Sequence, residues 1–255
     1  MQNLMDSRTL AYINMYAVLG TLENLCELVP EASELLKGKK PISIGFEVKG
    51  GPAATLYFKN GKCRMEQGCT NCDVKLPFSS CEKFNGLIDG TVTPVPSKGF
   101  THIGFLLKTF TPLTVMLSKY MRASKEDLED PVFFEISTKL MLYTIGVAIA
   151  QIGNNDEVGK FSAKAIEDGS VYMGIKNGPG LELVCKDHRL VTLKKTPEKY
   201  RAAMVFESIE TARALFDGEV NALACIGTGK IEMHGLVSML DNVNRILDRV
   251  ALYLA

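Results

Sequence analysis

Two pairs of stretches in the sequence repeat one another and set the expected fold. Residues 46–59 read FEVKGGPAATLYFK and residues 173–186 read MGIKNGPGLELVCK, with five identities in fourteen positions at an offset of 127. Residues 78–92 read FSSCEKFNGLIDGTV and residues 206–220 read FESIETARALFDGEV, with seven identities in fifteen positions at an offset of 128. Unrelated segments of this length share about one residue at ordinary composition. The two pairs therefore predict two copies of one unit of about 125 residues.

The boundary between the copies is expected in the most polar run of the chain, ASKEDLEDP at residues 123–131. We expect a first repeat over 1–123, a linker over 124–131 and a second repeat over 132–255. Ser124 and Asp127 have the spacing of a helix-start box. The linker is therefore expected to contain a short helix.

Each copy shows the same succession of patterns. In the first, apolar residues recur at helical steps over 12–26, alternate as in strands over 42–48, 55–58 and 62–66, and return to helical steps over 80–89 and 110–120, with a strand expected at 100–106. In the second, helices are expected at 134–152, 158–166, 208–217 and 236–250, and strands at 171–175, 181–185, 190–193 and 229–233. Gly90 and Gly218 stand where left-handed helix caps would end the central helices. This order predicts an α+β fold in which each copy has a mostly antiparallel sheet layered with helices.

Composition excludes several classes of protein. The chain has 255 residues, 46% of them hydrophobic, which argues against disorder. Lys+Arg and Asp+Glu number 29 each, so a general nucleic-acid binder is disfavoured and no nucleic-acid partner is expected. The seven cysteines and the absence of a secretory pattern at the first residues predict a cytoplasmic protein with reduced thiols. The near-apolar stretch 140–152 is shorter than the roughly 20 residues of a membrane span, so it is expected to form a buried helix, and membrane contact to be at most transient.

Four local motifs resemble those of one known family. They are the KNGK turn at 59–62, CDVKL at 72–76, SCEKFNGLIDG at 80–90 and GKIEMHG at 229–235. Together they resemble the sterol carrier protein type-two domain, a lipid-binding α+β fold, over residues 40–120 and 165–250. The first copy departs from the family pattern because FTHI at 100–103 replaces the Gly-Lys-Ile strand start.

The resemblance implies a carrier that binds an apolar ligand, such as a fatty acid, a fatty acyl thioester or another lipid, in a tunnel between sheet and helices. No cofactor is implied. Neither a GxSxG elbow nor an HExxH motif is present, so we expect no enzymatic activity. The candidate pocket residues are apolar side chains of the central and final helices and the last strands: Phe84, Leu87, Phe105, Phe110, Leu113, Met116, Leu117, Phe216, Met233, Leu236, Met239 and Leu240.

Two alternative functions remain open at the level of sequence. Cys63, Cys69, Cys72 and Cys81 lie within one stretch that includes a CxxC pair, a pattern that can bind a metal ion or cycle between thiol and disulfide. The apolar helices could instead bind a partner protein, which would make the chain a protein-interaction module.

Overall fold

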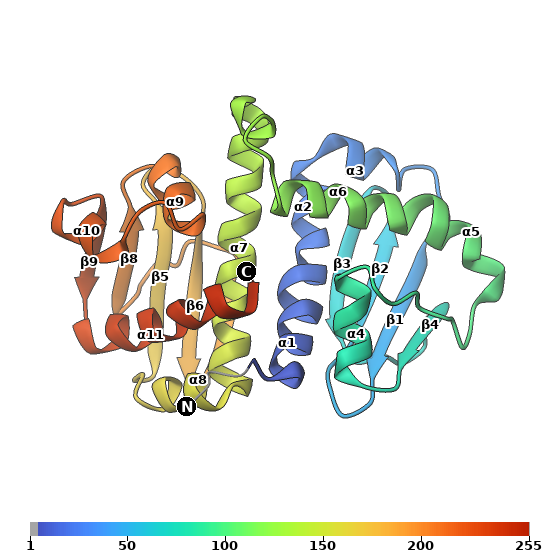
Figure 1. Cartoon of the computed structure of the whole chain (residues 1–255), viewed down its shortest axis with the longest axis horizontal. Coiled ribbons are helices and arrows are strands. Elements are labelled where there is room, and N and C mark those ends of the chain that lie inside the picture. The colour runs from blue at the N-terminus through green and yellow to red at the C-terminus, as the bar shows by residue number, and fades with distance from the viewer. Residues whose placement is uncertain (1–4, 255) are drawn as a thin grey trace. The chain divides into compact units, whose positions relative to one another are not determined.

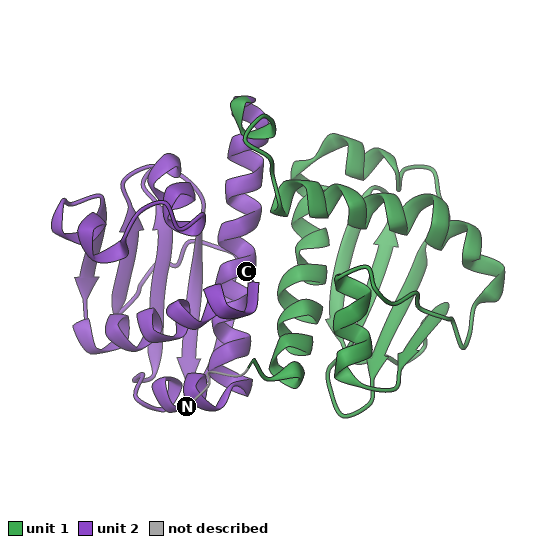
Figure 2. Ribbon diagram, viewed as in Figure 1, with its two compact units in different colours: residues 1–129 green, residues 130–255 purple. Residues whose placement is uncertain are grey.

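The computed structural model describes residues 5–254; residues 1–4, part of the chain start considered above, and residue 255 lie outside that description. The chain divides into two compact units, unit 1 (residues 1–129) and unit 2 (residues 130–255), shown in Figure 2. Each unit contains one sheet and several helices. The predicted α+β class is confirmed.

Unit 1 has a four-stranded sheet in the order β3-β2-β1-β4 (Figure 1). Strands β1, β2 and β3 are antiparallel, and β4 runs parallel to β1. The elements of the unit are α1 (Ser7–Ile13), the π-helical turn η1 (Asn14–Val18), the 3-10 turn η2 (Leu19–Thr21), α2 (Leu22–Leu28), α3 (Pro30–Glu34), β1 (Ile42–Val48), β2 (Ala53–Lys59), β3 (Lys62–Gln67), β4 (Val74–Phe78), α4 (Cys81–Ile88), the 3-10 turn η3 (Phe100–His102), α5 (Ile103–Phe105), the π-helical turn η4 (Leu106–Phe110), α6 (Thr111–Met121) and the 3-10 turn η5 (Asp127–Glu129).

Unit 2 has a five-stranded sheet in the order β7-β6-β5-β8-β9, with β8 parallel to β5 and the other pairs antiparallel. Its elements are α7 (Pro131–Asn155), α8 (Glu157–Lys164), β5 (Gly169–Ile175), β6 (Gly180–Lys186), β7 (Arg189–Leu193), β8 (Ala202–Phe206), α9 (Ile209–Phe216), α10 (Ala222–Gly227), β9 (Ile231–Gly235) and α11 (Val237–Leu254). The sequence patterns had not assigned β8 or α10, and β9 begins two residues later than expected.

The two units match element by element through their central parts. Strands β1 and β2 have the same lengths as β5 and β6 at an offset of 127, and β4 and α4 have the same lengths as β8 and α9 at an offset of 128. The offset changes in the segment before the parallel strand, 68–73 in unit 1 and 194–201 in unit 2. Cys69 and Cys72 lie in that segment of unit 1.

The central helices start and end where the sequence predicts. The hydroxyl oxygens of Ser80 and Ser208 accept hydrogen bonds from backbone N–H groups of the first turns of α4 and α9. Gly90 and Gly218 follow these helices with φ of 73° and 72°, a left-handed conformation that glycine adopts without strain. At the linker, the Ser124 hydroxyl accepts a hydrogen bond from the Asp127 backbone N–H and the Asp127 carboxylate accepts one from the Ser124 backbone N–H, as expected, and Asp127 begins the short helix η5.

The units differ after α4 and α9, and there one prediction is wrong. In unit 2, β9 pairs along β8, but among the described residues of unit 1 the matching edge of β4 carries only one bridge, between Lys75 and Lys98. Gly99, at φ 88°, then turns the chain away. The strand expected at 100–106 is therefore helical instead, because Phe100, Ile103 and Leu107 recur at the three- and four-residue steps of a helix.

Helix α7 packs closely against the sheet of unit 2 through two glycines. A Cβ atom at Gly146 would stand 2.2 Å from a Leu181 methyl, and one at Gly153 would stand 2.5 Å from a Leu190 methyl. The Thr192 hydroxyl also donates a 2.7 Å hydrogen bond to the Gly146 carbonyl. The predicted buried helix at 140–152 is thus the middle of a longer core helix.

By length and composition alone, two helical segments within residues 5–254 could cross a membrane, Phe100–Met121 and Pro131–Asn155. Half of the most apolar window of the second is buried within the protein, against 22% for the first. The second segment is α7, whose apolar side chains pack in the core, whereas few residues of the first segment are fully buried.

Candidate ligand-binding cavity

A cavity of about 570 Å³ opens in unit 1 between the sheet edge and the helices that follow it. Four parts of the chain form its wall: the turn from η1 to η2, strand β4 with the end of α4, the loop 92–96, and the helical segment from α5 to the end of α6. The lining residues are Val18, Leu19, Leu76, Leu87, Ile88, Gly90, Val92, Thr93, Pro94, Pro96, Ile103, Leu106, Leu107, Phe110, Thr111, Thr114, Val115, Leu117, Ser118, Met121 and Arg122. Its volume falls within the roughly 300–1,000 Å³ of small-molecule sites.

Two π-helical turns contribute to this wall. Val18 ends η1, and Leu106, Leu107 and Phe110 belong to η4. A π turn holds one more residue than an α turn, so it displaces the helix surface locally, and such turns are frequent at functional sites. Both of these departures from α geometry occur on the boundary of one cavity.

The wall is apolar in character. Of the described residues that line the cavity, only Arg122 carries a charge, and it is exposed at the end of α6. The hydroxyls of Thr111 and Thr114 donate hydrogen bonds to the carbonyls of Leu106 and Thr111 within the helix. Both hydroxyl groups therefore already have backbone acceptors and need no polar ligand group as a partner.

Three apolar lining residues mark the opening of the cavity. Ile103, Leu107 and Val115 line it and are nevertheless 41%, 65% and 63% exposed. The opposite wall includes the loop 92–94, which also borders a more open surface hollow near Glu47 and Lys83. The cavity is thus bounded on one side by a short loop and on the other by a partly exposed helix.

The predicted pocket residues of unit 1 divide between this cavity and the core. Leu87, Phe110 and Leu117 line the cavity. Phe84 and Leu113 are fully buried in the core, where the Phe84 ring contacts Phe46 and Phe78. Phe105 packs against Phe58 at 5.5 Å between ring centroids, and Met116 is half-buried on α6 without lining the cavity.

The predicted residues of unit 2 lie on α9, β9 and α11 and, for Leu236, between β9 and α11. Met239 and Leu240 of α11 are buried, Met233 and Leu236 are half-buried, and the Phe216 ring packs against Phe206 at 5.7 Å. However, the cavity described above belongs to unit 1 and includes none of them.

Most of the remaining lining residues carried a weak signal in the sequence. Leu106 and Leu107 fell at or just after the segment expected to be a strand, and the loop 92–96, VTPVP, has no periodic pattern. Val18 and Leu19 belong to the opening helical stretch, whose apolar stripe does not distinguish a core position from a cavity wall.

The four cysteines of the alternative metal-site hypothesis do not lie close to one another. Cys69 and Cys72 form a pair with their Sγ atoms 3.8 Å apart, whereas Cys63 contacts Cys26 instead. Cys81 begins α4, and its sulfur lies against the turn between β1 and β2, where a Cβ at Gly51 would stand 2.8 Å from it. Within residues 5–254, no group of three or more His, Cys, Asp or Glu side chains is placed to hold a metal ion. The predicted four-cysteine metal site is therefore corrected to one thiol pair.

The thiol pair occupies a space that a glycine leaves over the sheet. A Cβ atom at Gly45 of β1 would stand 2.4 Å from the Cys69 sulfur and 2.6 Å from the Cys72 sulfur. The pKa of the Cys69 thiol is raised to about 11, mainly by burial and secondly by the hydrogen bond with Cys72. A thiol with so high a pKa is a poor nucleophile at neutral pH because little of it is ionised.

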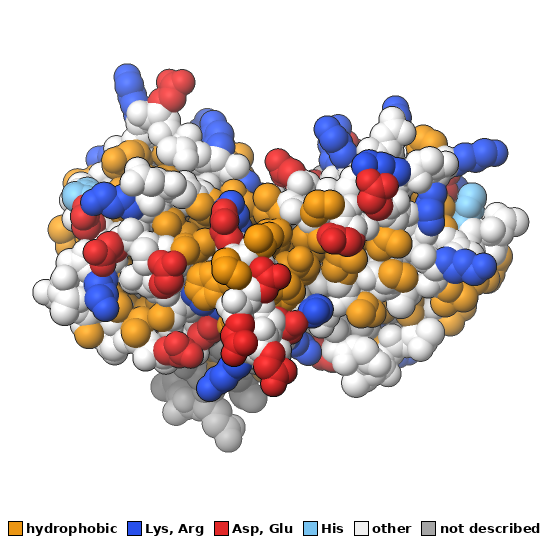
Figure 3. Space-filling model, turned by 90° about the horizontal axis from the view of Figure 1, so that it is seen from above, with side chains coloured by type: hydrophobic (Ala, Val, Ile, Leu, Met, Phe, Trp, Pro, Cys, Tyr) orange, Lys and Arg blue, Asp and Glu red, His pale blue; other side chains and the backbone are white. Residues whose placement is uncertain are grey.

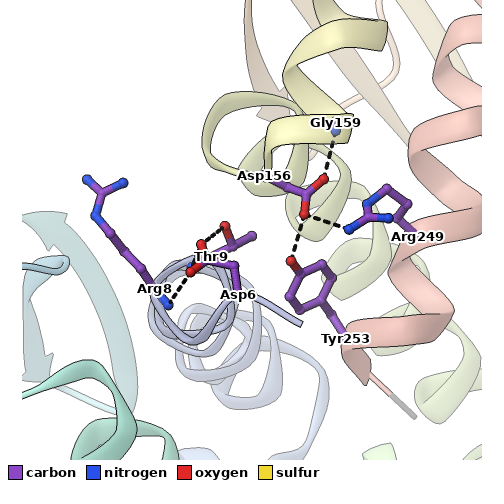
Figure 4. A network of polar contacts seen from close by, with 7 residues as sticks. All are labelled: Asp6, Arg8, Thr9, Asp156, Gly159, Arg249 and Tyr253. Carbon is purple, nitrogen blue, oxygen red and sulfur yellow. Dashed lines mark hydrogen bonds and ion pairs between the residues drawn. The ribbon is translucent and has the colours of Figure 1, made fainter. Parts of the chain in front are cut away.

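Helix α11 of unit 2 is held by a buried polar network (Figure 4). One oxygen of the Asp156 carboxylate accepts hydrogen bonds from Arg249 and Tyr253, both at 2.7 Å, and the other accepts one from the Gly159 amide at 2.8 Å. At the corresponding junction of unit 1, Val29 precedes α3 and provides no side-chain cap. The final helix of unit 2 thus has an ionic anchor at a position where unit 1 has an apolar residue.

The fold and this site together define an α+β protein with an apolar cavity of ligand size in its first unit. No protein-family model and no curated protein matches the sequence. Solved structures do show likeness. The sterol carrier protein domain 2 of Helicoverpa armigera is 16% identical, with 44% of this chain and 88% of that chain covered and a TM-score of 0.36.

Two further solved structures have lower TM-scores. Sterol carrier protein 2 from Yarrowia lipolytica, in its apo form, is 22% identical, with 42% of this chain and 89% of that chain covered and a TM-score of 0.32. A stereoselective inverting sec-alkylsulfatase from Pseudomonas sp. is 12% identical, with 56% of this chain and 28% of that chain covered and a TM-score of 0.26. The sterol carrier matches cover less than half of this chain and concern a single domain's fold.

Proposed function

We propose that the protein binds an apolar ligand in the cavity of unit 1 and carries it in the cytoplasm without changing it chemically. The ligand class is a fatty acid, a fatty acyl thioester or another lipid. The observation that carries this function is the cavity itself, which has ligand size, an apolar wall and an opening bordered by Ile103, Leu107 and Val115.

The physical basis is the transfer of a hydrocarbon chain from water to this wall. Each buried methylene contributes about 0.8 kcal/mol, so ten of them give about 8 kcal/mol before the costs of association are subtracted. Arg122 at the rim supplies a positive charge beside which an anionic head group would remain in water. A single-chain amphiphile therefore fits the cavity better than a compact polar metabolite.

We further propose that the chain is a tandem of two sterol-carrier-like copies with unequal roles. The matching sheet orders and element lengths support a common origin. The segment after α4 has lost all but one bridge of the fifth strand and forms the cavity wall instead, while unit 2 keeps β9 and anchors α11 through Asp156. Unit 1 would thus hold the ligand, and unit 2 would be the more rigid copy.

The test compares two tryptophan substitutions on one helix. Thr114 and Met116 are both half-buried on α6, but only Thr114 lines the cavity. We expect Thr114→Trp to weaken displacement-measured binding of a fluorescent fatty acid at least tenfold because the indole occupies ligand space. The matched control Met116→Trp is expected to change binding less than threefold.

Native mass spectrometry of the purified wild-type protein, before and after organic extraction, provides an independent readout. An extractable adduct of lipid mass, recovered unchanged after incubation, supports binding without catalysis. Equal affinity for the Thr114→Trp and Met116→Trp proteins would contradict the cavity as the site. Hydrolysis of a fatty acyl thioester by the wild type would contradict the absence of catalysis.

A further inference from the structure

The segment from the end of α4 to the linker has an unusual distribution of charge. The whole chain contains equal numbers of basic and acidic residues, but residues 90–125 contain no Asp or Glu. The same residues include five Lys or Arg: Lys98, Lys108, Lys119, Arg122 and Lys125. This 36-residue stretch is thus strongly basic within a chain of zero net charge.

The same segment exposes large apolar side chains to solvent. Val95, Phe100, Ile103, Leu107 and Val115 are 71%, 59%, 41%, 65% and 63% exposed. Only 22% of the most apolar window of Phe100–Met121 is buried, although that segment has the length and apolar composition of a membrane span. Side chains of this kind, exposed on neighbouring turns, mark an interaction surface rather than a random exposure.

The apolar and basic residues are interleaved along the chain. Phe100, Ile103 and Leu107 follow one another at helical steps, and the exposed Lys108 comes directly after them. At the right-hand edge of Figure 3, in the half of the picture occupied by unit 1, apolar side chains lie beside Lys or Arg and His side chains. An apolar face bordered by lysines and arginines is the pattern of helices that lie in the interface of a membrane.

We propose that residues 95–122 form a docking surface for an anionic lipid bilayer. Phe100, Ile103 and Leu107 would enter the boundary between head groups and acyl chains, while Lys108 and Arg122 would face the anionic head groups. Lys119 is paired with the Asp127 carboxylate at 3.1 Å, so Lys108 and Arg122 carry the attraction. Charge complementarity selects this occupant, since each Lys or Arg that reaches a negative surface raises the affinity about fivefold.

Docking would also orient the cavity. Ile103, Leu107 and Val115 border its opening and belong to the same exposed surface. A bilayer in contact with them would therefore cover the opening, so a lipid could pass between membrane and cavity without crossing bulk water. The docking itself requires no bound ligand, because the exposed side chains and charges are present on the protein alone.

The test measures cosedimentation of the full chain with vesicles of phosphatidylcholine alone and of phosphatidylcholine with 30% phosphatidylserine. We expect the protein to bind the anionic vesicles, and its affinity for them to fall at least tenfold in 0.5 M NaCl because salt screens the charges. Phe100→Ser and Lys108→Glu should each weaken binding at least fivefold. Phe100 does not line the cavity, so the first variant should keep its affinity for a fluorescent fatty acid.

The matched control is Phe161→Ser, which removes a phenylalanine that is 73% exposed on α8 of unit 2, among residues of both charges. Its binding should equal that of the wild type. Absence of binding to anionic vesicles, or equal losses in Phe161→Ser and Phe100→Ser, would overturn the docking surface. A wild-type dimer that Phe100→Ser converts to a monomer, without vesicle binding, would assign the surface to a second copy of the chain instead. Far-ultraviolet circular dichroism of each variant establishes that it is folded.

Discussion

The buried carboxylate of Asp156 offers a quantitative test of how unit 2 holds its final helix. Its side chain and that of Arg249 are 5% and 10% exposed, and the two meet at 2.7 Å. In Asp156→Asn the shape is preserved and an amide oxygen can still accept the Gly159 N–H, so the helix cap is retained. The negative charge is lost, and an amide N–H group can now face the donors of Arg249 and Tyr253.

The expected cost follows from this geometry. Removing one partner of a buried ion pair costs about 3–5 kcal/mol because the other charge stays buried without compensation. A matched control lies on the same helix, where Asp241 and Arg245 form a pair at 3.0 Å with both side chains more than half exposed. Asp241→Asn should cost only about 0.3–0.5 kcal/mol, the usual value for exposed helical pairs. Urea unfolding at pH 7, followed by circular dichroism, measures both losses.

The pH dependence gives a second readout of the same network. Burial raises the pKa of Asp156, but hydrogen bonds from Arg249, Tyr253 and the Gly159 amide lower it more, so the pKa lies below the ordinary value of 3.8. A carboxylate with a lowered pKa contributes its stability above pH 3.8, and the contribution disappears as the pH falls through the folded pKa. The difference between wild type and Asp156→Asn should therefore shrink below about pH 4. Equal losses in Asp156→Asn and Asp241→Asn at pH 7 would refute the reasoning.

Three other predictions concern local features of the fold. Ser80→Ala and Ser208→Ala each remove the N-terminal cap of a central helix and should lower the free energy of unfolding by about 1 kcal/mol. Urea titration measures this loss, and an unchanged free energy would show that the caps do not contribute to stability. Gly99→Ala places a Cβ atom on a residue with φ 88°, 2.4 Å from a backbone oxygen. We expect the free energy of unfolding to fall by about 1–3 kcal/mol and amide hydrogen exchange over 100–121 to become faster. An exchange rate equal to that of the wild type would contradict the strained turn. Cys69, whose pKa is raised from 9.0 to about 11, should react with iodoacetamide roughly 100-fold more slowly at pH 7 than a thiol of unshifted pKa, and a rate equal to that of a free thiol would favour a redox function instead.

Much of the fold was predictable because its signals are local. The Ser80 and Ser208 caps, the glycines that end α4 and α9 and the Asn60-Gly61 turn act within a few residues of where they stand. Strand alternation depends equally on adjacent residues. Because these signals occur twice in the same order, the sequence also indicates a duplicated arrangement. The same reasoning failed at 100–106, where short apolar runs fit either a strand or a helix and the absence of a full fifth strand decided the outcome.

The cavity and the polar network depend on contacts that sequence patterns do not contain. Leu113 and Leu117 belong to the same helical stripe, yet Leu113 is in the core and Leu117 lines the cavity. Asp156 and Arg249 are 93 residues apart, and nothing local to either predicts the other. The sequence by itself determined most of the strands and helices and the α+β class, since these follow from short-range periodicity and turn chemistry. Only the tertiary structure decided where apolar surfaces meet and where they leave a space, because the filling of that space depends on residues brought together from distant parts of the chain.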